Sequence, residues 1–184
     1  MAQEAEADLE AAWEALEMAV DLHERVGGAA DVGGLAEARE RLGDVALQNE
    51  QPERALEEYT EARRLLVSLR EAGALPAHDR RLADIEWFLG MCNIQMRQGE
   101  AAISHYNQAA ATFRLRRASL QRAALDRQIE VLAREAEAPA GGAVGDGGND
   151  GSEGASEIAQ IDELLVEIEA RTRLLVQQAM QQPQ

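Results

Sequence analysis

The sequence predicts an all-α protein, in which an array of paired helices is closed by a C-terminal capping helical hairpin. Three observations support this fold class. Alanine, glutamate, leucine, glutamine and arginine dominate the 184 residues, and these types favour helix, whereas only 3 % of the chain is aromatic. Apolar residues recur at three- and four-residue steps, and no segment alternates with the period of a strand. One spacing of small and aromatic residues also occurs twice along the chain.

The first three helices are expected to lie before residue 72. A first helix carries one apolar face and ends near Gly27-Gly28. A second is expected over 35–47 and a third over 53–71, since Pro52 suits the first turn of a helix. The apolar face of the first helix is formed by Leu9, Trp13, Leu16, Val20 and Leu22.

The second half of the chain is expected to hold longer helices. A fourth helix opens at 76–79 and runs to about Gln98. Residues 100–138 contain neither glycine nor proline, so they form one very long helix or two joined without a visible break. The next 19 residues, 138–156, contain seven glycines and are expected to be a flexible linker.

The last segment carries a heptad-like apolar seam that needs a partner helix. We expect an antiparallel hairpin in which the end of the long helix covers that seam. The seam consists of Ile158, Ile161, Leu165, Ile168, Thr172, Leu175 and Ala179. The expected partner residues are Leu125, Ile129, Leu132 and Ala136.

An internal repeat organises the middle of the chain. Leu42-Gly43 is followed by a small, an aromatic and a small residue 12, 16 and 19 positions after the glycine, and so is Leu89-Gly90. These residues are Ala55, Tyr59 and Ala62 in the first copy and Ala102, Tyr106 and Ala109 in the second. The spacing resembles the tetratricopeptide pattern, in which small residues let two helices approach and an aromatic ring fills the gap.

The two glycines lie 47 residues apart, compared with about 34 in an ordinary tetratricopeptide repeat. Ala12, Leu16 and Ala19 repeat the spacing of a second repeat helix. We therefore divide the chain into an acidic start with helix B of an incomplete repeat (1–34), two tetratricopeptide-like repeats (35–75 and 76–116), a long helix extension (117–137), the glycine-rich linker (138–156) and a capping helix (157–184).

This combination resembles the interrupted-tetratricopeptide histone chaperones of the nuclear autoantigenic sperm protein (NASP) family, apparently without their first repeat. The runs Asp8–Ala19, Arg41–Val45, Ala55–Tyr59 and Ala77–Asp84 carry the resemblance, with Leu89-Gly90 and Ile158–Glu169. The chain also departs from the family in lacking its long acidic insertion and its basic C-terminal tail. The resemblance covers about residues 8–182.

The repeat pattern also indicates which side chains line the concave face. Counting from each glycine, the first helix of a repeat turns acidic side chains inward in repeat one, and mostly apolar ones in repeat two. The candidate partner-binding residues are Glu37, Glu40, Asp44, Gln48, Asp84, Trp87 and Met91. Carboxylates accept arginine and lysine, and a tryptophan–methionine pocket accepts an aliphatic anchor. The resemblance implies that Asp44, Asp84 and Trp87 contact the C-terminal segment of histone three, with Gln48 where the family can have glutamate.

The function expected from the resemblance is a histone chaperone module for core histones three and four, and for linker histone as a further candidate. It would support histone storage, transport and nucleosome assembly in the nucleus, with a cytoplasmic pool. Two alternatives stay open: a generic tetratricopeptide adaptor for another basic peptide or partner protein, and a structural homodimer that uses the seam of the last helix. In the alternative interpretation, Trp87 is a core residue between helices, and Asp44 and Asp84 are acids exposed to solvent.

Charge and composition exclude several other classes. The net charge is −16, and residues 1–61 hold 17 acids against four arginines, which opposes direct DNA or anionic-membrane contact. Lysine is absent, so lysine-dependent chemistry is excluded. No nucleophile–base pair is recognisable, and we expect no enzyme, no cofactor and no metal. A calcium-loop match over 146–157 has glycines at two ligand positions, which favours a linker.

Overall fold

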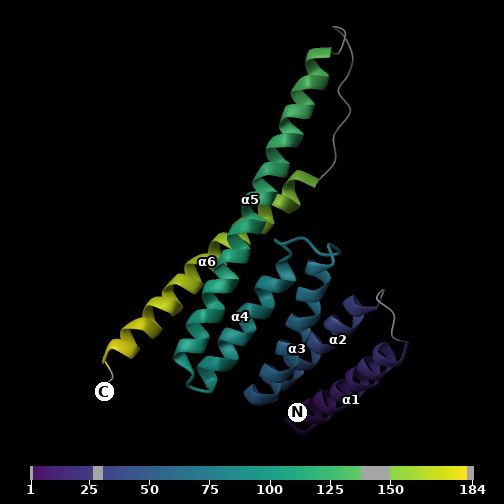
Figure 1. Cartoon of the computed structure of the whole chain (residues 1–184), viewed down its shortest axis with the longest axis vertical. Coiled ribbons are helices and arrows are strands. Elements are labelled where there is room, and N and C mark those ends of the chain that lie inside the picture. The colour runs from purple at the N-terminus through teal and green to yellow at the C-terminus, as the bar shows by residue number, and fades with distance from the viewer. Residues whose placement is uncertain (1, 27–30, 138–149, 182–184) are drawn as a thin grey trace.

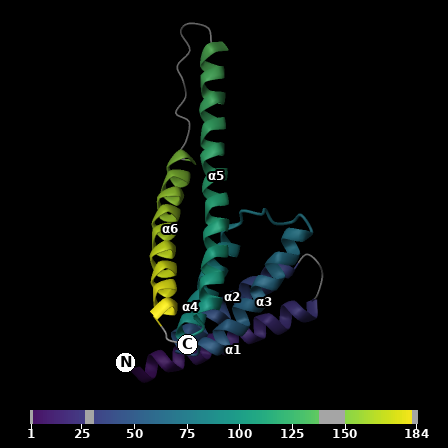
Figure 2. The same ribbon diagram turned by 60° about the vertical axis from the view of Figure 1, so that its left-hand side comes forward.

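The computed structural model describes residues 2–26, 31–137 and 150–181, all of which belong to helices or to the short turns between them. The helices are α1 (Ala2–Val26), α2 (Val32–Gln48), α3 (Pro52–Glu71), α4 (Arg80–Gln95), α5 (Gly99–Glu137) and α6 (Asp150–Gln181). They form a row in which consecutive helices pack side by side, and the upper half of α5 projects beyond the others (Figures 1 and 2). No strand occurs in these ranges, so the all-α prediction is confirmed.

Two helical pairs, α2–α3 and α4–α5, form the repeats, and their turns have the same backbone geometry. Glu50 and Arg97 end α2 and α4 with φ of 56° and 59°, and they lie 47 positions apart. After each, the next amide donates back to a carbonyl of the last helical turn, from Gln51 to Ala46 (2.9 Å) and from Gln98 to Asn93 (2.8 Å). This arrangement is a Schellman motif. The repeat seen in the side-chain spacing therefore extends to the backbone.

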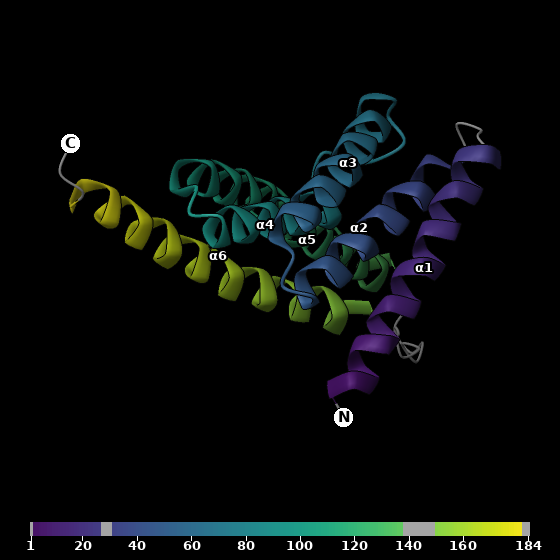
Figure 3. The ribbon, with the colours of Figure 1, turned by 90° about the horizontal axis from the view of Figure 1, so that it is seen from below.

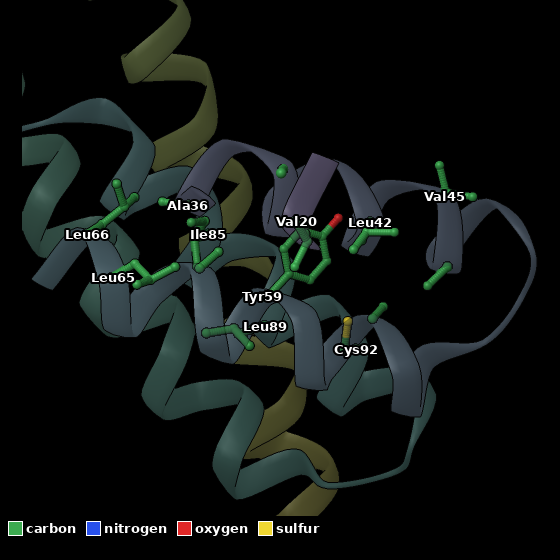
Figure 4. Packing of buried hydrophobic residues seen from close by; sticks show 14 of the residues in the cluster. Val20, Ala36, Leu42, Val45, Tyr59, Leu65, Leu66, Ile85, Leu89 and Cys92 are labelled. Carbon is green, nitrogen blue, oxygen red and sulfur yellow. The ribbon is translucent and has the colours of Figure 1, made fainter. Parts of the chain in front are cut away.

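Each pair of helices is held close by a glycine that faces a tyrosine ring. A Cβ on Gly43 would lie 2.7 Å from Tyr59 Cε1, and one on Gly90 would lie 2.7 Å from Tyr106 Cε1. Both tyrosines are fully buried, as are the four spacing alanines. Figure 4 shows the Tyr59 ring among Leu42, Leu89 and Cys92. The small residues are thus required for the distance between the two helices, as the spacing predicted.

The buried residues form two clusters that meet on α4. One joins α1, α2, α3 and one side of α4, where Leu82, Ile85 and Leu89 contribute. The other joins α5 and α6 with the opposite side of α4 through Ala83, and Trp87 packs against it. Among the described residues, no helix has both the length and the apolar character needed to cross a membrane.

Residues 100–137 lie within a single helix, α5, which settles the question left open by the absence of glycine and proline. The helix α6 packs against its first half, where Tyr106, Ala109 and Phe113 meet Ile161, Leu165 and Ile168. Three ion pairs join the two helices in this register: Arg116–Glu157 (3.0 Å), Arg117–Asp162 (2.6 Å) and Arg114–Glu169 (3.2 Å).

The expected hairpin partner of α6 was therefore wrong. Leu125, Ile129 and Leu132 are 52 %, 56 % and 63 % exposed rather than covered by the seam. The seam instead covers the already clustered Tyr106–Phe113 stretch, because this contact also buries Ala83 and adds to an existing core. The centre of the seam, at Ile161, Leu165 and Ile168, is thus buried within the chain. The side chain of Ala136 lies outside the described residues.

The boundary of the glycine-rich linker also changes. The helix α6 begins at Asp150 rather than at residue 157, so residues 150–156 are helical despite two glycines. Residues 138–149 lie outside the described part of the chain. A calcium loop over 146–157 would need a sharp turn at its sixth position, Gly151, where the structure has helix.

The glycine–tyrosine contact makes a testable stability prediction. Gly43→Ala should lower the free energy of unfolding by about 1–3 kcal/mol, because the new methyl group meets the Tyr59 ring and forces the helices apart. Gly33→Ala in the same helix is the matched control, since a Cβ there meets nothing within 4 Å. Thermal unfolding followed by circular dichroism should show a lower Tm for the first variant and an unchanged or higher Tm for the second. Equal Tm values would contradict this interpretation.

Candidate functional site

The helices α2 and α4 contribute a group of carboxylates on the side that the repeat pattern predicts to be the inner face. Glu37, Glu40 and Asp44 are spaced three and four residues apart, so they share one side of α2. Asp44 and Asp84 both act electrostatically on Glu40. The structure therefore brings together acids from the two repeats that the repeat pattern placed on a concave face. We call Glu40, Asp44 and Asp84 the acidic cluster.

Asp44 is oriented by the tyrosine that fills its own repeat. The Tyr59 hydroxyl donates a hydrogen bond to Asp44 Oδ1 at 2.7 Å. Burial, followed by this hydrogen bond, raises the pKa of Tyr59, so the phenol stays protonated as a donor. Asp44 also has Arg41 Nη1 at 3.7 Å from Oδ2. The sequence assigned Tyr59 a purely structural role, whereas the structure shows that it also holds a carboxylate in place.

Glu40 lies at the centre of the acidic cluster, and its proton affinity is unusual. Burial, and then the negative charges of Asp44 and Asp84, raise the pKa of Glu40 to about 7. The opposing effects of Arg41 and Arg81 are smaller. A cation placed beside Glu40 would favour its ionised form. Binding of a basic ligand here should therefore release a proton near neutral pH.

Asp84 begins the contribution of α4. Burial raises its pKa, while the nearby Arg80 opposes the shift, with Arg80 Nε at 3.4 Å from Asp84 Oδ2. Asp79 caps the N-terminus of α4 one turn earlier, since its side chain accepts a hydrogen bond from the Arg81 amide at 3.0 Å. Asp84 is thus a half-buried acid one turn after the helix start, with the basic Arg80 already within reach.

The second half of the predicted groove differs from the expectation of an open apolar pocket. Trp87 is half-buried and packs against Tyr106, with ring centroids 5.2 Å apart at 57°. The guanidinium of Arg171, on α6, lies 4.8 Å from the Trp87 ring centroid and 3.5 Å from the Tyr106 hydroxyl. A partner's side chain would have to share or displace this contact in order to reach the tryptophan face. Figure 3 shows α6 running along the α4–α5 end of the array.

The remaining predicted residues lie around these two regions. Glu37 and Gln48 are exposed near the two ends of α2, and Arg81 is within electrostatic reach of Glu37. Met91 is half-buried. It comes directly after Gly90 in repeat two, at the position that Asp44 occupies after Gly43 in repeat one. Repeat two therefore has a thioether where repeat one has a carboxylate, so the charge is concentrated on the α2 side.

One buried charge escaped the sequence analysis. Glu86 on α4 is only 5 % exposed, and it pairs with Arg63 of α3 and with His105 of α5, whose Nδ1 lies 2.7 Å from Glu86 Oε2. Burial acts to raise the pKa of Glu86. Hydrogen bonds from His105 and Arg63 outweigh burial and hold that pKa below its ordinary value.

The 47-residue spacing between the two repeats relates this buried pair to an equivalent pair in repeat one. Glu86 and His105 correspond to Arg39 and Glu58, which are also paired, at 2.9 Å between Arg39 Nη1 and Glu58 Oε2. The same two positions thus hold a paired acid and base in both repeats, with the acid and the base exchanged. Reading the repeat for opposite charges, as well as for small and aromatic residues, would have found both.

Other candidate chemistry is weak in the part of the chain that the structure describes. No group of three or more histidine, cysteine, aspartate or glutamate side chains there could hold a metal ion. Burial raises the pKa of the Cys92 thiol to about 11, so it is protonated at neutral pH. His78 lies 3.1 Å from the Ser119 hydroxyl, and His23 lies 2.6 Å from Asp31.

Comparison with known proteins places this chain in no established family. No protein-family model matches the sequence, and no curated protein matches it. Among solved structures, the chain is similar to the crystal structure of BtubC (BKLC) from P. vanneervenii, at 15 % identity, over 96 % of this chain and 94 % of that chain. The TM-score is 0.26, and such a likeness says nothing about function.

The raised pKa of Glu40 makes a prediction about stability and pH. Because its folded pKa of about 7 lies above the ordinary 4.5, the folded chain binds this proton more tightly than the unfolded chain does. The resulting stability is complete below about pH 4.5 and is lost as the pH rises through about 7. Glu40→Gln should therefore flatten the fall in the free energy of unfolding across this range, measured by urea titration. Glu37→Gln, at an exposed position one turn earlier, should keep the wild-type slope, and a wild-type slope in Glu40→Gln would contradict the prediction.

The Glu86 contacts predict a large stability effect. Glu86→Gln should lower the free energy of unfolding by about 3 kcal/mol, near the low end for breaking a buried pair, because Arg63 is partly exposed. Glu61→Gln is the matched control, because it breaks the exposed Glu61–Arg64 pair on α3. It should change the free energy of unfolding little. Urea unfolding at neutral pH measures both variants. A similar loss in the two would show that Glu86 is not a buried structural charge.

Proposed function

We propose that this chain is a histone chaperone module that binds core histones three and four through the acidic inner face of its helical array. The C-terminal segment of histone three would lie along α2 and the start of α4. Such binding would shield the basic histone from non-specific contacts and release it for nucleosome assembly, in the nucleus and in a cytoplasmic pool. The acidic cluster is the observation that carries this proposal.

The acidic cluster supports a basic ligand because its negative charges are held close together. Asp44 and Asp84 both raise the cost of ionising Glu40. A lysine or arginine that enters between Glu40 and Asp84 relieves the repulsion and gains charge-assisted hydrogen bonds. The ligand is thus favoured by charge neutralisation, with no energy source other than binding.

Specificity beyond charge would come from Trp87 and Met91. An aliphatic or basic side chain of the ligand would replace Arg171 on the tryptophan face, while Met91 adapts its shape to the incoming group. The Arg171 contact also favours a second candidate function. If α6 keeps Trp87 covered, the inner face selects by charge alone, and the chain is a generic adaptor for basic peptides or partner proteins.

Titration calorimetry against a refolded complex of histones three and four tests the proposal. Asp84→Arg should weaken binding by at least about tenfold, because a lost charge-assisted contact becomes a repulsion. Glu163→Arg, which makes the same charge change on exposed α6, is the control and should bind nearly as tightly as the wild type. Equal losses in the two variants would mean that only the overall charge matters.

A second set of titrations separates the two candidate functions. A peptide with the C-terminal sequence of histone three should bind more tightly than its scrambled version if the chaperone proposal holds. Equal affinities would favour the adaptor. In both cases, repeating the titration in buffers of different ionisation enthalpy should reveal proton release near pH 7, as the pKa of Glu40 requires.

A further inference from the structure

The outward side of α1 combines exposed apolar side chains with a strong negative charge. Met18 and Leu22 are 67 % and 59 % exposed, and their four-residue spacing places them together on one side of the helix. The expectation that Leu22 belongs to the apolar face formed with Trp13 and Val20 was therefore wrong. Met18 and Leu22 lie on α1 at one end of the row of helices, where the described residues of α1 pack mainly against α2 (Figure 3). The end of a helical array normally presents a polar surface to water.

The opposite side of α1 holds the helix firmly in the array. Trp13 and Val20 are 9 % and 7 % exposed and belong to the main cluster of buried residues. The guanidinium of Arg54, from α3, lies 3.7 Å from the centre of the Trp13 ring and reaches Glu17 Oε1 at 3.6 Å. The exposure of Met18 and Leu22 is therefore a property of an ordered helix with two unlike sides.

Acidic side chains surround the apolar pair. Glu14, Glu17 and Asp21, with Met18, line an open hollow of about 400 Å³. Two of these acids have basic partners within the chain: Arg54 reaches Glu17, and Arg25 pairs with Asp21. The whole of α1 carries eight acids and a single arginine. A second copy of this surface would bring like charges together, so the charge disfavours self-association through α1.

We propose that this side of α1 is a docking surface for a cationic amphipathic helix of a partner protein. An aliphatic side chain of the partner packs against Met18 and Leu22. Basic side chains one turn away on either side pair with Glu14 and Asp21, which matches the helix-to-helix mode of peptide recognition. The surface shares no residue with the acidic cluster of the inner face, so this inference goes beyond the proposed histone-binding function and does not depend on it.

Methionine methyl groups offer reporters that separate the two surfaces. The chain has five methionines, and ¹³C-methyl labelling gives a signal from each. Three of them report on separate regions: Met18 on α1, Met91 on α4, which carries Asp84 of the acidic cluster, and Met180 on α6. The probe is a synthetic helical peptide of lysine and leucine with leucines at i and i+4. The control peptide has glutamine in place of leucine and the same charge. We expect the leucine peptide to shift the Met18 signal at saturation and to leave Met91 and Met180 unchanged.

Three outcomes would overturn the inference. The first is a shift of Met91 without one of Met18, which would place the peptide on the inner face. The second is an equal Met18 shift with the glutamine peptide, which would mean diffuse charge attraction only. The third is a Met18 signal that moves with protein concentration before peptide is added, which would make a second copy the occupant. Failure of histone binding would change none of these readings.

A pair of double variants tests the charge contribution. Glu14→Gln with Asp21→Asn should weaken peptide binding about fivefold, as expected for the loss of two exposed ion pairs. Glu100→Gln with Glu163→Gln removes the same charge from exposed positions on α5 and α6 and should leave the affinity nearly unchanged. Equal affinities for the two double variants would overturn the assignment of Glu14 and Asp21.

Discussion

The close approach of the two helices in each repeat is the constraint on which the other features of this structure depend. A bare Cα at Gly43 or Gly90 lets a tyrosine ring lie flat against the helix, and the buried alanines leave room for it. Because the ring fills that space, its hydroxyl emerges at a fixed place on the inner face. In repeat one it meets Asp44, and in repeat two it lies beside Arg171 of α6. The same packing device therefore positions a carboxylate in one repeat and a capping helix in the other.

The charged residues of the array follow two different physical regimes. Glu86 is buried but receives hydrogen bonds from two bases, so its charged form is favoured. Glu40 is partly buried among other acids, so its charged form is disfavoured. Glu86 therefore links α3, α4 and α5 inside the array. Glu40 is an acid that takes up a proton near neutral pH, and this difference separates Glu86 from the candidate binding acids.

Much of the array could be predicted because its determinants are local and repeat. The spacing of Gly43, Ala55 and Tyr59 recurs after 47 residues, and so do the turns at Glu50 and Arg97. The same counting predicted the inner face for the acids of α2, and the structure shows that Asp44 and Asp84 act on Glu40. Glu86 was missed because it was read as one of many acids. Only its partners on two other helices make it special.

The position of α6 could not be predicted for a different reason. Its seam is an ordinary apolar stripe that fits any complementary helix, and both halves of α5 carry suitable side chains. The choice between them is made by the whole surface that each arrangement buries, including Ala83 on a third helix. For the same reason the cover that Arg171 places on Trp87 was not foreseen, since this contact exists only once the register of α6 is fixed.

The helix α4 belongs to both buried clusters, and this has a consequence for how the molecule unfolds. Leu82, Ile85 and Leu89 pack in one cluster, whereas Ala83 and Trp87 pack in or against the other. The two halves of the array are therefore connected through opposite sides of a single helix. In a linear array each unit supports only its neighbours, and the ends can open independently. Hydrogen exchange should therefore divide into two cooperative blocks with α4 as their shared boundary. A ligand held by α2 and α4 together would couple the blocks and make them open as one.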